Sequence, residues 1–249
     1  MFCTGHRHSL SCVFRRVEQP ISRQPVVGIL ANEDTGREDQ LVASWALVVP
    51  VKPLPVAKSR LADVARDRRS DLALAMAADT VQAALSAPAV ATVIAVTDDP
   101  RAAELLGRLG AVVVGDEPDA GLNPALRHGA SAARGYATAV GALSADLPAL
   151  RPEPLSAVLG EAAQHPVAFL PDMASTGTTL YTTTADTAFD PLFGEHSARE
   201  HRRAGAVELG LPDAASVRRD VDTGADLLAA VQLGVGAHTR DLLRELRIE

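Results

Sequence analysis

Cysteines and aromatic residues are scarce in this sequence. Of its 249 residues only 2 are cysteines, Cys3 and Cys12, and both lie close to the N-terminus. Two cysteines at one end of a chain can neither staple a core nor supply the partners of a zinc site, which fits a reducing, cytoplasmic compartment. Aromatics make up 3% of the residues, so the sequence does not indicate a surface on which the bases of single-stranded nucleic acid would stack.

Positive charge is in the minority. The chain has 24 Lys plus Arg against 31 Asp plus Glu, a formal net charge of −7, which disfavours general nucleic-acid binding. No apolar run approaches the roughly twenty residues that cross a membrane. The apolar stretches near the N-terminus are broken by histidines and arginines, unlike those of a signal peptide. We therefore expect neither nucleic acid nor a membrane as a partner.

Residues 1–44 differ from the rest of the chain. They show no steady hydrophobic period, and the segment "ANEDTGREDQ" at 31–40 is typical of a solvated linker. We interpret residues 1–44 as a disordered N-terminal extension, or as a start assigned too far upstream. Residues 45–249 are expected to form a single domain.

From Trp45 onward, apolar runs of strand length alternate with stretches of helical spacing. The run "WALVVPV" is typical of a buried strand, and "SDLALAMAADTVQAAL" places apolar residues at helical intervals. The same alternation continues to about residue 171. Strands that alternate with helices predict an α/β fold with a doubly wound, mainly parallel sheet, in which ligands bind beyond the carboxyl ends of the strands.

Two of the predicted strand-end loops suit a nucleotide. The loop 49–61 carries Lys52, Lys58 and Arg60, whose charges would offset a polyphosphate, although a solvated turn stiffened by prolines explains them equally well. It lacks the glycines of a P-loop. In the loop 115–130, Asn123 precedes or opens a helix. It could bond a ribose or a base, or simply act as the N-cap.

Three aspartates suit a divalent cation. Asp146 directly follows a predicted buried strand, where a carboxylate is a natural Mg²⁺ ligand, although turn aspartates are common too. Asp220 and Asp222 are spaced i and i+2, so on an extended segment ending a strand they share one face. Like charges side by side favour a cation between them. The alternative is that this exposed pair caps a turn.

The segment 176–205 suits a small anion. Gly177, Thr178 and Thr179 lead into a short strand, and Gly194 and Ser197 precede a predicted helix, whose free N–H groups attract anions. Ser197 could instead be an N-cap that forms a capping box with Glu200. That alternative leaves the surrounding histidines and arginines unexplained.

Six segments together carry a resemblance to a known family. They are "VPVKPLPVAKSRLADV", "GLNPALRHGA", "SADLPAL", "TGTTL", "FGEHSAREHRRAGA" and "DVDTGADL". In this order, over about 45–233, they resemble the 2-phospho-L-lactate and phosphoenolpyruvate guanylyltransferases of coenzyme F-420 biosynthesis. This family is similar to nucleotidyltransferases of the glycosyltransferase-A-like fold. The lysine-rich loop stands where sugar nucleotidyltransferases have a glycine-rich one.

The resemblance implies a reaction and roles for residues. It implies GTP as donor, Mg²⁺ as metal, and transfer of GMP with release of pyrophosphate. It places Asp146, Asp220 and Asp222 at the metal. It places Thr178 or Thr179, with Gly194 and Ser197, around the acceptor; Thr179 stands where many members have asparagine. Lys52, Lys58, Arg60 and Asn123 would contact GTP.

The acceptor and the assembly stay open at this point. The alanine- and arginine-rich chain is similar to bacterial members, which favours phosphoenolpyruvate over 2-phospho-L-lactate. A homodimer is not excluded. Two alternative functions are a nucleotidyltransferase for another acceptor, such as molybdopterin or a sugar phosphate, and a catalytically inactive nucleotide-binding regulator. Three aspartates speak against the regulator, because binding alone does not need a second carboxylate beside the first.

Overall fold

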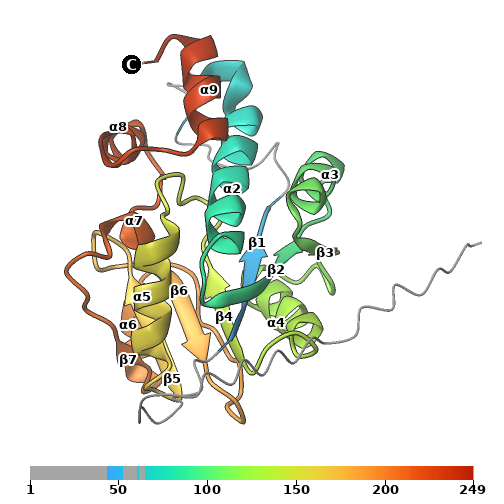
Figure 1. Ribbon diagram of the computed structural model, residues 1–249, viewed down its shortest axis with the longest axis vertical. Coiled ribbons are helices and arrows are strands. Elements are labelled where there is room, and N and C mark those ends of the chain that lie inside the picture. The colour runs from blue at the N-terminus through green and yellow to red at the C-terminus, as the bar shows by residue number, and fades with distance from the viewer. Residues whose placement is uncertain (1–43, 53–60, 62–64, 249) are drawn as a thin grey trace, which may run out of the picture. The chain divides into compact units, whose positions relative to one another are not determined.

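The computed structural model describes residues 44–52, 61 and 65–248 (Figure 1). Contacts divide the chain into two units, Met1–Gln40 and Leu41–Glu249, and every described residue belongs to the second. The predicted N-terminal extension lies outside the described residues, except for Ser44 at its end. Within the described part, no helix combines the length and the apolarity needed to cross a membrane.

The described part of the chain forms a seven-stranded sheet whose order is β3-β2-β1-β4-β6-β5-β7. Strand β6 is antiparallel to both β4 and β5, whereas every other neighbouring pair is parallel. The prediction of a doubly wound, mainly parallel sheet is therefore confirmed. The strands are β1 (Trp45–Pro50), β2 (Val90–Val96), β3 (Val112–Val114), β4 (Ala139–Leu143), β5 (Val167–Pro171), β6 (Thr178–Thr183) and β7 (Val207–Glu208).

Helices cover both faces of the sheet (Figure 1). They are the 3-10 helix η3 (Arg66–Arg68), α2 (Arg69–Leu85), α3 (Pro100–Leu109), α4 (Leu122–Ala133), α5 (Pro152–Ala162), α6 (Ser197–Arg203), α7 (Ala215–Arg218), α8 (Gly224–Leu233) and α9 (Ala237–Leu246).

Alternating strand residues point into two separate cores. Leu47 and Val49 of β1 face a core shared with α2, α3 and α5, while Ala46 and Val48 face one shared with α4 and α6. This is the period-two pattern of a strand buried on both faces, and it explains the continuous apolar run from Trp45. A third core joins α2 to α8 and α9.

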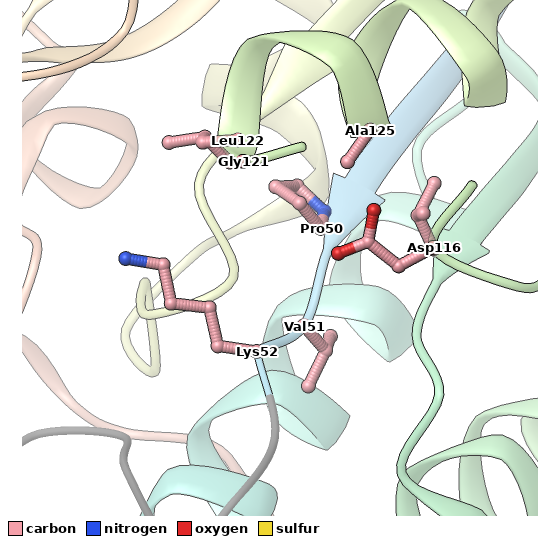
Figure 2. A pocket seen from close by; sticks show the side chains of 8 residues that line it. Pro50, Val51, Lys52, Asp116, Gly121, Leu122 and Ala125 are labelled. Atoms are coloured by element: carbon pink, nitrogen blue, oxygen red, sulfur yellow. The ribbon is translucent and has the colours of Figure 1, made fainter. Parts of the chain in front are cut away.

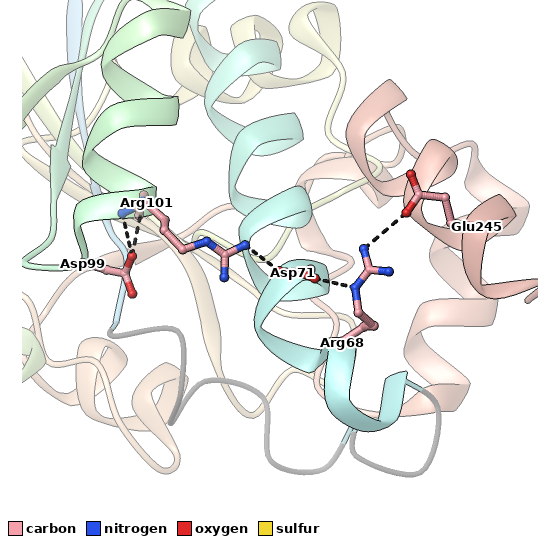
Figure 3. A network of polar contacts seen from close by, with 6 residues as sticks. Arg68, Asp71, Asp99, Arg101 and Glu245 are labelled. Carbon is pink, nitrogen blue, oxygen red and sulfur yellow. Dashed lines mark hydrogen bonds and ion pairs between the residues drawn. The ribbon is translucent and has the colours of Figure 1, made fainter.

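Charged side chains join α2 to its neighbours at the surface (Figure 3). Asp71 accepts hydrogen bonds from Arg101 of α3 and from Arg68, and Arg68 also reaches Glu245 of α9 at 3.2 Å. Hydrogen bonding by Arg101 is the largest effect that lowers the pKa of Asp71. Because these groups are partly exposed, solvent screening keeps the contribution of each pair to stability small.

Candidate functional site

The loops that carry the predicted site residues meet at one edge of the sheet. This edge holds the carboxyl ends of β1, β2 and β4, which are parallel. Strand β6 runs the opposite way and pairs Leu180 with Leu143 of β4, so β6 begins where β4 ends. Thr178 and Asp146 therefore lie at the same edge, although 32 positions separate them in the chain.

The loop that carries Asp146 is held from three sides. The hydroxyl of Thr80 on α2 accepts a hydrogen bond from the N–H of Leu147 at 3.0 Å, and the N–H of Ser144 donates to the carbonyl of Thr179 at 2.9 Å. The carbonyl of Pro148 accepts from the N–H of Gly236 at 2.8 Å. A helix, a strand and a distant loop thus fix the backbone on both sides of Asp146.

A backbone hydrogen bond brings the other two aspartates to this loop. The N–H of Val221 donates to the carbonyl of Asp146 at 3.1 Å. Val221 is fully buried, whereas its neighbour Asp220 is half-buried and Asp222 is exposed. The structure therefore brings the segments of the three aspartates together, and their role at a metal stays a prediction.

The prediction that Asp220 and Asp222 end a strand is wrong. Residues 219–223 contain no strand, because α7 ends at Arg218 and α8 starts at Gly224. Thr223 caps α8 with a capping box that includes Asp226. Only a short connection remains between the two helices, and a backbone hydrogen bond from Val221 to Asp146 ties it to the loop after β4.

The three aspartates form no closed metal cluster. Among the described residues, no three His, Cys, Asp or Glu side chains gather closely enough to hold a metal ion by themselves. The donor chemistry nevertheless fits Mg²⁺, which takes one or two carboxylates and fills its remaining positions with phosphates and water. A site completed by a substrate's phosphates needs no closed protein cage.

The turn between β5 and β6 is tied to the same region. Asp172 accepts hydrogen bonds from the N–H groups of Thr176 and Gly177 at 2.9 and 2.8 Å. A Cβ on Gly177 would lie 2.5 Å from this carboxylate, so the turn requires glycine there. Arg218 donates to the carbonyls of Pro171 and Asp172 at 3.0 and 2.7 Å. Because Arg218 ends α7, the turn before Thr178 and the segment of Asp220 are clamped together.

A shift of register distinguishes the two candidate threonines. Leu170 of β5 pairs with Leu180, but Pro171 pairs with Thr178, which leaves Thr179 as an extra residue in β6. Such a bulge re-aims side chains. The hydroxyl of Thr179 is fully buried and faces the carbonyl of Leu170 at 3.5 Å, whereas that of Thr178 lies 3.0 Å from Nδ1 of His201.

The partners of His201 fix the direction of its hydrogen bonds. The N–H of Leu192 donates to Nε2 of His201 at 2.8 Å, so Nε2 is the acceptor. Burial lowers the pKa of His201 to about 4, and the neutral ring therefore carries its proton on Nδ1. It follows that Nδ1 donates to the Thr178 oxygen, and the hydroxyl proton of Thr178 remains able to point elsewhere. Aromatic neighbours hold the ring in place: Tyr181 stacks on it at 4.8 Å between centroids.

The loop before α6 is held against α4. The Asn123 side chain donates to the carbonyl of Phe193 at 2.9 Å and accepts from its N–H at 2.8 Å. Gly194 follows directly. The alternative in which Asn123 is an N-cap is wrong, because the N-cap of α4 is Gly121. Asn123 instead joins two of the predicted loops, and its contact with GTP stays a prediction.

Ser197 opens α6 but does not cap it. The N-cap is His196, in a left-handed conformation with φ 57° and without a side-chain hydrogen bond to the helix, so the capping box of Ser197 with Glu200 is not formed. The Ser197 side chain is almost fully buried. The N–H of Ala198 donates to the carbonyl of Thr176 at 3.2 Å, which places Ser197 beside the Thr176–Thr178 segment.

A pocket opens at the ends of β1 and β2, next to the start of α4 (Figure 2). Its lining comprises Pro50, Val51, Lys52, Val96, Asp116, Gly121, Leu122 and Ala125. It thus joins Lys52 of the predicted phosphate loop to the start of α4. Lys58 and Arg60 lie outside the described residues, so their predicted contact with GTP stays a prediction.

A family model named "Guanylyl transferase CofC like" matches residues 45–249. The chain belongs to this family. A phosphoenolpyruvate guanylyltransferase of Streptomyces coelicolor is 56% identical over 207 residues, covering 82% of this chain and 98% of its own. Another with the same name, from Thermomonospora curvata, is 54% identical and covers 80% of this chain and 88% of its own.

Solved structures of nucleotidyltransferases share the fold. A protein from Desulfovibrio desulfuricans, described as a nucleotide-diphospho-sugar transferase, matches with a TM-score of 0.62 at 23% identity, covering 82% of this chain and 95% of that one. A nucleotidyl transferase from Methanothermobacter matches with a TM-score of 0.54 at 22% identity, covering 77% and 97%. At such identities the likeness concerns the fold alone.

Sequence reasoning about this CofC-like chain missed several supporting residues. Thr80 is one polar side chain inside a helix, and nothing in the local pattern indicates that it holds the Asp146 loop. Arg218 reads as a surface arginine until the β5–β6 turn is placed beside it. His201 was noted only as part of a basic cluster, whereas it is fully buried. Asp116 lies in the loop 115–130, and only the pocket sets it apart from its acidic neighbours.

Proposed function

We propose that this chain transfers GMP from GTP to the phosphate of phosphoenolpyruvate and releases pyrophosphate, as a step in coenzyme F-420 biosynthesis. The observation that carries the proposal is the set of phosphoenolpyruvate guanylyltransferases that are 54–56% identical to it over most of both chains. The gathering of the predicted loops at one sheet edge supports it, because a nucleotide, an acceptor and a cation must meet there.

The chain's own residues would hold the reactants in line. Lys52, with Lys58 and Arg60, offsets the charge of the triphosphate. The hydroxyl of Thr178 donates to the acceptor's anionic groups, with Ser197 and the backbone near Gly194 beside it. The acceptor phosphate is already ionised at neutral pH, so no general base is needed. An oxygen of that phosphate attacks the α-phosphorus of GTP, and pyrophosphate leaves; catalysis consists of positioning and charge neutralisation.

Magnesium completes the proposed site. Asp146 and Asp220 are half-buried and lie on segments that the hydrogen bond from the Val221 N–H to the Asp146 carbonyl joins, and Asp222 is exposed one residue beyond Val221. When bound, Mg²⁺ supplies positive charge to phosphate oxygens. The chain's part is to keep the carboxylates in place, which the hydrogen bonds around the Asp146 loop support.

Asp220 and Asp222 should therefore behave as one unit. We expect Asp220→Asn and Asp222→Asn each to remove most of the turnover, and the double variant to lose much less than the sum, because cooperating groups are non-additive. Added Mg²⁺ should raise the melting temperature of the parent more than that of the double variant. The measurements are initial rates of pyrophosphate release and melting curves on all four proteins. Additive losses, or equal stabilisation by Mg²⁺, would contradict a shared metal site and favour two aspartates that cap a turn.

A panel of acceptors tests the function itself. Pyrophosphate release from GTP should be fastest with phosphoenolpyruvate, slower with 2-phospho-L-lactate, and near background with sugar phosphates or molybdopterin. A preference for 2-phospho-L-lactate would keep the chemistry and change the acceptor. No release with any acceptor, together with tight GTP binding, would point instead to a nucleotide-binding regulator.

A further inference from the structure

The pocket in Figure 2 has apolar walls and one carboxylate at its edge. Pro50, Val51, Val96, Leu122 and Ala125 form most of its lining. Its cavity volume is about 130 Å³, and its mouth is open to solvent. Apolar walls suit the faces of an aromatic base. The polar groups at the rim then decide which base edge is accepted.

The pocket is built on a rigid frame. Backbone hydrogen bonds continue past the strand ends: the N–H of Val51 donates to Val96 at 2.8 Å, and that of Thr97 donates to Val114 at 3.0 Å. The backbone of Asp116 is fixed in turn, because its N–H donates to the Asp98 carboxylate at 3.0 Å. Its side chain is therefore held at the pocket rather than on a freely moving loop.

The Asp116 carboxylate lacks donors. One of its oxygens, Oδ1, is buried and has no hydrogen-bond partner among the residues that the structure describes. Burial, together with the nearby charges of Asp98 and Asp119, raises the pKa of this carboxyl. A buried acceptor without a donor is unfavourable, so a ligand that supplies N–H groups would relieve this cost. In Figure 2 the carboxylate points toward Pro50, while the Lys52 ammonium lies on the other side of the labelled residues.

We infer that Asp116 reads the guanine base of the donor nucleotide by accepting its N1–H and 2-amino hydrogen bonds on the two carboxylate oxygens. This inference rests on the proposed use of GTP. The Watson–Crick edge of guanine presents these two donors side by side. Adenine and cytosine each present one donor beside a ring-nitrogen acceptor, which would face a carboxylate oxygen with repulsion. A carboxylate between apolar walls therefore selects guanine. Any other base leaves at least one carboxylate oxygen without a hydrogen-bond donor, which weakens the binding of that base.

The test exchanges one base for another. In Asp116→Asn the side chain keeps one acceptor and gains one donor. Xanthine has a carbonyl where guanine has the 2-amino group, so its edge matches Asn. We expect the parent to prefer GTP over ITP, which lacks the 2-amino group, by roughly 10- to 100-fold in kcat/KM, and to use XTP poorly. Asp116→Asn should lose most activity with GTP and gain activity with XTP.

Asp119→Asn is the matched control. Asp119 lies three residues further along the same loop, is exposed and does not line the pocket. Its backbone is left-handed, with φ 54°, a conformation that Asn tolerates. This variant should keep the parent's order of nucleotides. The use of XTP is a gained activity, which a misfolded Asp116→Asn protein could not show. The melting temperature of Asp116→Asn should equal or exceed that of the parent, because the substitution neutralises a carboxylate that its acidic neighbours repel.

Two outcomes would overturn the inference. If Asp116→Asn keeps the parent's ratio of GTP to ITP to XTP, the carboxylate does not read the base. If only the parent discriminates against 2′-deoxy-GTP, and Asp116→Asn loses GTP and XTP alike, the carboxylate binds the ribose. Shifts of melting temperature by each nucleotide separate this question from catalysis. If GTP stabilises the parent, XTP stabilises Asp116→Asn, and neither protein transfers a nucleotide, the inference about base reading stands and the proposed reaction is refuted.

Discussion

At the scale of single residues, the hydrogen bond between Thr178 and His201 assigns different tasks to two neighbouring threonines. His201 donates to Thr178, which leaves the Thr178 proton for a ligand, whereas the Thr179 hydroxyl faces a main-chain carbonyl in the interior. The sequence could not separate them, because the choice depends on a bulge created by the pairing of β5 with β6. The sequence motif identifies Thr178 and Thr179 together, and only the strand register shows which of the two hydroxyls can face a ligand.

Thr178→Val should raise the KM for phosphoenolpyruvate by roughly 10- to 100-fold, because it removes a hydrogen bond to a charged group without changing the side chain's size. The KM for GTP should stay near that of the parent. Thr178→Ser keeps the hydroxyl and should restore most of the affinity, and Thr179→Val serves as the control. Steady-state kinetics with each substrate varied in turn measures this. A larger effect in Thr179→Val than in Thr178→Val would reverse the assignment.

His201 should make stability depend on pH. Its pKa is about 4 in the folded protein and about 6.5 in an unfolded chain, so between these values the unfolded state binds more protons. Its contribution is complete above pH 6.5 and is lost as the pH falls toward 4, by roughly 3 kcal/mol in all. Urea unfolding at pH 7.5, 5.5 and 4.5 should show a shallower fall for His201→Gln than for the parent. His196→Gln, at an exposed position, is the control, and equal slopes in all three proteins would contradict the account.

At the scale of elements, α9 is capped from a distance. Asp79, buried inside α2, accepts hydrogen bonds from the N–H groups of His238 and Thr239 at 2.9 and 2.8 Å. Gly236 precedes this turn, where a Cβ would lie 2.4 Å from the Asp79 carboxylate. Gly236 also holds the carbonyl of Pro148, so the docking of α9 reaches the loop of Asp146.

Asp79→Ala should lower the free energy of unfolding by about 2–3 kcal/mol, because two buried N–H groups at the start of α9 lose their acceptor. Activity below the melting transition should remain, since Asp79 touches no proposed substrate. Asp241→Ala, at a more exposed position on the same helix, should cost less than about 0.5 kcal/mol. Denaturant unfolding and initial rates measure both. Equal losses in the two variants would show that Asp79 does not cap the helix.

Most elements could be predicted from the sequence because their local signals agree. Asp99 and Pro100 start α3 and Gly110 ends it with φ 106°, all visible as start and stop residues. The stretch around Asp220 was different. Its i, i+2 spacing is shared by strands and by any extended connection, and only the capping box at Thr223 shows how little chain remains between two helices. Long-range partners such as Thr80 and Asp79 carry no local signal at all.

At the scale of the molecule, the sequence predicted the layered architecture but not the order of the strands. The reversal of β6 brings Thr178 to the edge where β4 ends, and it depends on pairing between strands that lie far apart in sequence. The gathering of the site therefore required the structure. The resemblance to the guanylyltransferase family singles out the same site residues without a structure, because the family's motifs follow one another along the chain.

Removal of residues 1–43 should leave both kcat/KM and the melting temperature unchanged. The family model begins at residue 45, and β1 begins at Trp45, so the truncated chain retains every element that positions the site. Side-by-side assays and melting curves of the full and truncated chains measure this. A drop in melting temperature or in activity would show that the N-terminal segment contributes to the folded domain.

The identity of the phosphorus products tests the central claim most directly. The protein is incubated with GTP, Mg²⁺ and phosphoenolpyruvate, and the mixture is followed by ³¹P NMR. We predict the growth of pyrophosphate together with two mutually coupled signals from an unsymmetrical diphosphate that joins GMP to enolpyruvate, both lost in the Asp220→Asn, Asp222→Asn double variant. Formation of free GMP, of GDP with inorganic phosphate, or no consumption of phosphoenolpyruvate would contradict guanylyl transfer.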